Sequence, residues 1–105
     1  MSYANFARMK VILTEKGMVE DGKIQQYALM ADNYINKDLI NTTEPVIPIP
    51  IPPDIVIDLA TALGCALFYK FESGDTITAQ QAEQDWKDYF IAKYKRPRFV
   101  ISTGI

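Results

Sequence analysis

Two pairs of titratable residues lie one helical turn apart, and they are the first candidates for acid–base chemistry. Asp54 precedes Asp58 by four residues, and Asp85 precedes Tyr89 by the same spacing. Residues at i and i+4 face each other on a helix, so either pair could handle a substrate proton. Acidic residues on the outer face of amphipathic helices are nevertheless the ordinary case. The two pairs therefore favour a solvated surface over an active site.

Nucleophilic and metal-dependent chemistry has little support in the composition. The chain contains no histidine, which excludes Ser-His-Asp and Cys-His catalysis and imidazole metal ligands. Its single cysteine, Cys65, excludes an internal disulfide, and its small, apolar neighbours predict a buried thiol. The acidic residues Glu83, Asp85 and Asp88 match neither a Glu-x-x-His motif nor the spacing of a calcium loop. We expect no enzymatic activity, no cofactor and no bound metal.

Charge is divided unevenly along the chain. Residues 1 to 92 hold seven basic and thirteen acidic side chains, whereas residues 93 to 105 hold four basic side chains and no acidic one. The basic cluster could complement the dipole of a helix C-terminus, with Lys93 and Lys95 in or near the last turn. It could equally be a tail that docks on an acidic partner or on phosphates.

Length and composition indicate one globular domain. The chain has 105 residues, of which 49% are hydrophobic and 23% charged, and these proportions are ordinary for a folded protein. No apolar run reaches membrane-spanning length, and the N-terminus has no basic region followed by an apolar core. We expect no membrane association and a protein that stays in the cell that makes it.

Four hydrophobic patterns with helical periodicity predict an all-α fold, a small four-helix bundle. Ser2 is a plausible cap of the first helix, and Thr78 with Gln81 forms a possible capping box before the fourth. The third pattern is apolar on nearly all sides, so this helix should be central, with Leu63 and Trp86 in the seam of the bundle. The predicted helices cover about residues 4–15, 22–35, 53–71 and 78–96.

A proline-rich strap, residues 44–53, separates the second predicted helix from the third. Proline fixes φ and pushes the preceding residue into extended space, so Ile47, Ile49 and Ile51 should alternate along a stiff segment. Leaving such aliphatic side chains in water forgoes about 1.5 to 3 kcal/mol each. The strap should therefore cover either its own core or the surface of a partner. It belongs to a helical domain that spans residues 1–96.

The last residues, 97–105, predict an extended C-terminal arm. They are largely apolar and rich in residue types that favour β-strands, and they are too few to form a core of their own. Such an arm must fold back on the bundle or add to another surface, where Phe99 and Ile101 would enter pockets on one side of the strand. Arg96 and Arg98 would steer its approach.

Three of these elements together resemble the small head-to-tail connector proteins of tailed viruses. The helix before the strap, Tyr27 to Ile35, resembles the corresponding helix of that family, and Pro52 to Asp54 resembles the Pro-Pro start of the next helix. Leu59 to Tyr69 resembles the family's apolar helix, which ends in an aromatic pair. The resemblance covers roughly residues 20 to 100 and consists of patterns of residue class.

The resemblance implies a non-enzymatic virion protein of the neck, made in the host cytoplasm and located at the head–tail interface. It would form a ring, expected to be a dodecamer, between the portal protein and the stopper or tail-completion protein. Double-stranded DNA would pass through the ring without specific binding. The competing hypotheses are a small cellular protein-interaction adaptor module and a nucleic-acid-binding regulator. The predicted partner-binding residues are Ile47, Ile49, Ile51, Lys93, Lys95, Arg96, Arg98, Phe99, Val100 and Ile101.

Overall fold

Four α-helices account for most of the chain in this computed structural model, which describes residues 2–40, 42 and 47–94. No strand occurs among these residues, so the predicted all-α fold of four helices is confirmed. The predicted C-terminal arm lies outside the described residues. The helices are α1 (Phe6–Leu13), α2 (Asp21–Leu39), α3 (Asp54–Ser73) and α4 (Thr76–Tyr94).

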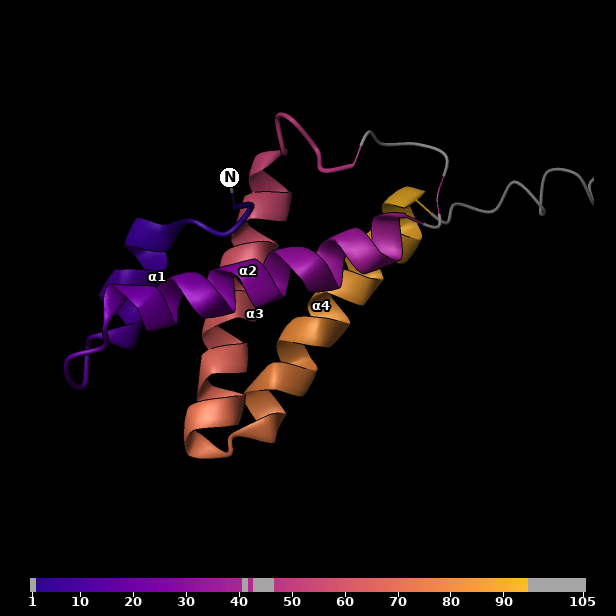
Figure 1. Ribbon diagram of the computed structural model, residues 1–105. Helices are drawn as coiled ribbons and strands as arrows, with labels where there is room; N and C mark the ends of the chain where they lie inside the picture. The colour runs from indigo at the N-terminus through magenta and orange to yellow at the C-terminus, as the bar shows by residue number, and fades with distance from the viewer. Residues whose placement is uncertain (1, 41, 43–46, 95–105) are drawn as a thin grey trace, which may run out of the picture.

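Helix α3 is the central element, as its apolar sequence predicts. It packs against each of the other three helices, whereas α4 meets α2 over a smaller area and does not contact α1. Figure 1 shows α3 and α4 side by side as a hairpin, with α2 crossing α3 and α1 on the side away from α4. No described helix combines the length and the hydropathy that crossing a membrane would require.

The helix starts differ from the predicted ones. Helix α1 begins after Asn5, whose side-chain oxygen accepts the Arg8 backbone N–H at 3.1 Å, so the expectation that Ser2 caps this helix was wrong. Before α4, the Asp75 carboxylate accepts two hydrogen bonds from Thr78. The backbone N–H of Thr78 donates at 3.1 Å and its side-chain hydroxyl at 2.7 Å. The helix therefore starts three residues earlier than the predicted capping box, because Asp75 provides a stronger, charged cap.

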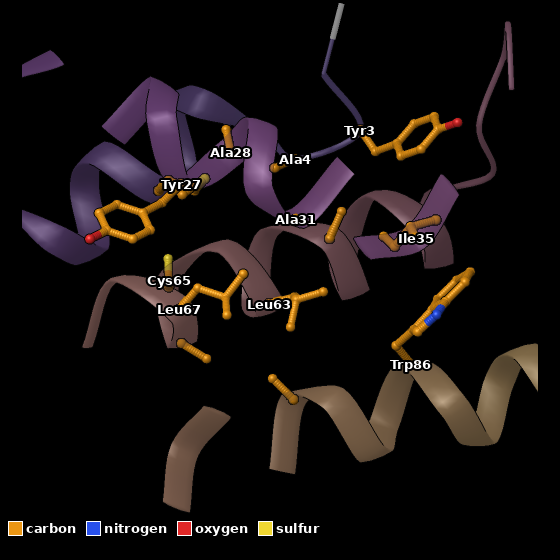
Figure 2. Close-up of a cluster of buried hydrophobic side chains, with 14 of the residues drawn as sticks. Tyr3, Ala4, Tyr27, Ala28, Ala31, Ile35, Leu63, Cys65, Leu67 and Trp86 are labelled. Atoms are coloured by element: carbon orange, nitrogen blue, oxygen red, sulfur yellow. The ribbon is translucent and has the colours of Figure 1, made fainter. Parts of the chain in front are cut away.

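The hydrophobic core lies around α3, where side chains of all four helices and of the N-terminal segment are buried. Leu63 of α3 and Trp86 of α4 are both fully buried, which confirms their predicted place in the seam. Figure 2 shows Leu63 and Ile35 pointing into the space between the helices, which the Trp86 ring enters from α4.

Helix α1 approaches α3 closely at a glycine. A Cβ added at Gly64 would lie 2.7 Å from Cε of Met9, a fully buried side chain of α1. The absence of a side chain at Gly64 therefore lets the two helices pack at this distance. The neighbouring Cys65 is buried as predicted, and burial raises the pKa of its thiol to about 11.

Polar ends of aromatic side chains connect α2 to α4. Trp86 Nε1 donates a hydrogen bond to Asp38 Oδ2 at 2.7 Å, and the Tyr34 hydroxyl donates to Glu83 Oε1 at 3.1 Å. Burial, together with the hydrogen bond to Glu83, raises the pKa of Tyr34 to about 12. These contacts satisfy the polar atoms of rings whose apolar parts pack between the helices.

Candidate functional site

Residues 47–53, the part of the strap that the structure describes, fold partly onto the helical body, and residues 44–46 lie outside the described residues. Ile47 and Ile49 are half-buried and pack against the hydrophobic core, which is the first of the two arrangements that the sequence leaves open. The chain then bends at residues 50 and 51, and Ile51 is 87% exposed. Of the three strap isoleucines predicted to bind a partner, Ile51 is therefore the one that presents a free side chain.

Tyr3 fixes the strap to the helical body. Its hydroxyl accepts the Ile49 backbone N–H at 2.8 Å and donates to Asn36 Oδ1 on α2 at 2.5 Å. The Tyr3 side chain is buried, and burial raises the pKa of its hydroxyl, with the charge of Asp32 acting in the same direction. One side chain thus joins the N-terminal segment, α2 and the strap.

The N-terminal segment is itself held by one buried and two partly buried hydrogen bonds to α2 and α3. The Asp32 carboxylate on α2 accepts the Tyr3 backbone N–H at 2.9 Å and the Ser2 hydroxyl at 3.1 Å. The Asn5 backbone N–H donates to Thr61 Oγ1 on α3 at 2.9 Å. Burial raises the pKa of Asp32, and its hydrogen bonds partly oppose that shift. Tyr3 is therefore held at both its backbone and its side chain.

Sequence reasoning missed this anchor. Asp32 lies four residues after Ala28 and three before Ile35, on the face predicted to be apolar. A carboxylate at such a position needs hydrogen-bond donors once it is buried. That requirement could have indicated a polar partner, although it would not have identified Tyr3 and Ser2 as the donors.

A small hollow lies between the N-terminal segment and the strap. It is lined by Ser2, Tyr3 and Ile49 together with three strap prolines, Pro48, Pro50 and Pro52. None of these side chains is charged, so the hollow suits an apolar side chain better than a phosphate or a metal ion.

The predicted basic surface falls mostly outside the described residues. Lys93 is exposed in the last turn of α4. The other predicted partner-binding residues lie outside the described part of the chain: Lys95, Arg96, Arg98, Phe99, Val100 and Ile101.

The acidic pairs considered for catalysis have ordinary surface partners. Asp58 forms an ion pair with Arg8 at 2.7 Å, and Asp85 accepts a hydrogen bond from the Gln81 amide at 2.8 Å. Asp54 is exposed in the first turn of α3, where its negative charge interacts favourably with the helix dipole. Within the described ranges, no group of three His, Cys, Asp or Glu side chains could hold a metal ion.

Exposed aliphatic side chains also occur on α1 and α4. On α1, Val11 is 73% exposed and Ile12 is also exposed. On α4, Ile77 is 77% exposed and Ile91 is also exposed. These four positions were not among the predicted interaction residues.

Comparisons with family models, curated proteins and solved structures found no match to this chain.

Proposed function

We propose that this protein is a non-enzymatic, ring-forming connector of a tailed virus. In this role it lies in the neck of the virion, binds the portal on one side and receives a stopper or tail-completion protein on the other. Double-stranded DNA passes through the ring. The observation that carries the proposal is the anchored strap, which holds an exposed Ile51 away from an otherwise well-packed body.

The strap suits a binding role because it is fixed before any partner arrives. Tyr3 holds Ile49 through the backbone N–H, and Ile47 and Ile49 pack on the core. Ile51 projects from this fixed segment. A partner that covers Ile51 gains about 1.5 to 3 kcal/mol of burial and orders little additional chain.

The charge distribution suits a channel that must not retain DNA. The first 92 residues carry nearly twice as many acidic as basic side chains, which repels a phosphate backbone. The basic cluster from Lys93 through Arg98 has the charge that an acidic surface on the portal would attract.

Native mass spectrometry and negative-stain microscopy test the proposal. The full chain is measured alone and with the portal protein of the same virus, and a dodecameric ring is expected in at least one of the two samples. The Ile51→Ser variant should attach to the portal more weakly, whereas Lys16→Ser, a change at another exposed position, should not. A chain that stays monomeric in both samples would contradict the proposal and favour the adaptor module.

DNA binding provides an independent test. Because the body is acidic, the protein should bind duplex DNA only weakly at about 150 mM salt, and that binding should fade steeply as salt rises. Fluorescence anisotropy with duplexes of two unrelated sequences measures this. Tight, sequence-dependent binding would instead support a nucleic-acid-binding regulator.

A further inference from the structure

Two apolar patches lie on helices that do not touch each other. The α1 patch consists of Ala7, Arg8, Val11 and Ile12, which line a shallow, open hollow with almost no polar surface. The α4 patch is one exposed aliphatic side chain, Ile91, with the exposed Asp88 on the same face. Helix α1 packs on α2 and α3, α4 packs mainly on the other side of α3, and α1 and α4 lie apart (Figure 1).

One charge beside each patch is complementary to the other, Arg8 on α1 and Asp88 on α4, whereas Lys87, one turn before Ile91, is paired with Asp38 at 3.9 Å. Helix α1 carries Arg8 and Lys10 and no acidic residue. Arg8 forms an ion pair with Asp58, but its side chain remains half exposed and its guanidinium has five N–H donors. A carboxylate from another chain can therefore reach it.

On α4, the exposed carboxylates lack cationic partners. Asp88 and Asp85 each accept a hydrogen bond from a glutamine amide at 2.8 Å. In the described part of the chain, no Lys or Arg lies within ion-pair distance of either carboxylate. Asp88 precedes Ile91 by three residues, so an acid and an exposed aliphatic side chain share one face.

We propose that the α1 patch of one copy binds the α4 patch of a second copy. Ile91 enters the hollow beside Val11 and Ile12, and Asp88 faces Arg8. This inference rests on the proposed ring and specifies which surfaces join its subunits.

The geometry of such a contact fits a ring. Because two different patches meet, the contact is heterologous, and repeated copies close into a ring or continue as a filament. Each patch contains few residues, so a single contact is expected to be weak. Closure strengthens the assembly, because every subunit then makes two contacts.

Engineered cysteines test the contact directly. The one native thiol, Cys65, is buried and its pKa is raised, so it should not interfere. A mixture of the Val11→Cys and Ile91→Cys chains under mild oxidation should give a disulfide-linked dimer, and a chain with both changes should give a ladder. Glu20→Cys, at an exposed position outside both patches, serves as the control partner for Ile91→Cys. The inference is overturned if the yield of the disulfide between positions 11 and 91 does not exceed the yield between positions 20 and 91. It is also overturned if the Val11→Cys chain forms disulfides mainly with other Val11→Cys chains.

A charge exchange provides the second test. Arg8→Glu and Asp88→Arg should each lower the yield of the 11–91 cross-link about tenfold, which is the effect of losing about 1.4 kcal/mol. The two changes together should restore most of it. If the two changes together do not restore the cross-link, the pairing of Arg8 with Asp88 is overturned.

The results also separate this inference from the proposed function. Closed rings seen by microscopy without an 11–91 cross-link would refute the contact and leave the connector proposal standing. Cross-linked chains that grow only as open filaments, with and without the portal, would support the contact and refute the ring.

Discussion

Two aromatic residues reach polar side chains of α2 from opposite directions, Trp86 from α4 and Tyr3 from the N-terminal segment. Both rings are buried, and both make short hydrogen bonds to α2, Trp86 with Asp38 at 2.7 Å and Tyr3 with Asn36 at 2.5 Å. Trp86 also packs against Phe90, with ring centroids 5.7 Å apart, as part of the main core. Tyr3 instead joins two irregular segments. The same type of contact therefore stabilises the whole bundle in one place and a local segment in the other.

Trp86→Ala tests the first half of this comparison. Removing a fully buried indole should lower the free energy of unfolding by about 3 to 5 kcal/mol, and Leu63→Ala should lower it by about 2 to 5 kcal/mol. Urea denaturation followed by circular dichroism measures both. The Trp86→Phe variant keeps most of the apolar ring and loses the N–H, so its cost should be smaller. Melting temperatures of both alanine variants within a degree or two of wild type would refute this description of the core.

Tyr3→Phe tests the second half, and its effect should be smaller and local. Without the hydroxyl, the Ile49 N–H and the Asn36 side chain lose a partly buried partner, which should cost about 1 to 3 kcal/mol. Hydrogen exchange should rise at the Ile47, Ile49 and Ile51 amides, since the other strap residues from 48 to 53 are prolines without an N–H, while the amides of α3 stay protected.

The matched control for Tyr3→Phe is Tyr34→Phe. It also removes one tyrosine hydroxyl, but the carboxylate it leaves, Glu83, is partly exposed and can be hydrated. Its cost at neutral pH should stay below about 1 kcal/mol. If Tyr3→Phe instead loosens all helices equally, Tyr3 belongs to the global core and the distinction between the two regions disappears.

The sequence predicts the Trp86 region far better than the Tyr3 region, and the reason is physical. Helical periodicity places Leu63 and Trp86 on buried faces, because apolar spacing of three and four residues is a local property. The Tyr3 anchor consists of hydrogen bonds between residues 29 to 46 positions apart, which no local pattern encodes. Capping was misjudged for a related reason: by residue type Asn5 is as good a cap as Ser2 and Asp75 a better one than Thr78, and residue type does not show where the helix starts.

The candidate site shows the same limit. Alternation along the strap treats Ile47, Ile49 and Ile51 alike, yet only Ile51 is exposed. The difference depends on Tyr3, which holds Ile49 against the body, and on the bend that follows. The α1 patch was missed because Val11 and Ile12 continue an apolar run in sequence, and only the packing of α1 shows which of its residues remain outside.

Alkaline pH gives a further way to separate individual tyrosines. The pKa of Tyr34 is raised to about 12, mainly by burial, above its ordinary value of 10.0. Its contribution to stability is therefore fully present below pH 10 and is lost as pH rises from 10 towards 12. Tyr34→Phe should lose less free energy of unfolding over this interval than wild type, as measured by urea denaturation at several pH values. Parallel profiles for the two proteins would contradict the assignment.

Ile51 should show the smallest effect on folding and so defines the boundary between the anchored and the exposed part of the strap. Because its side chain is 87% exposed, Ile51→Ser should change the free energy of unfolding by less than about 0.5 kcal/mol. Ile49→Ser, two residues away and packed on the core, should cost about 1 to 2 kcal/mol. Both are measured by denaturation of the isolated protein. If Ile51→Ser proves as costly as Ile49→Ser, Ile51 is buried in solution, and the strap then covers its own core along its whole length and presents no surface to a partner.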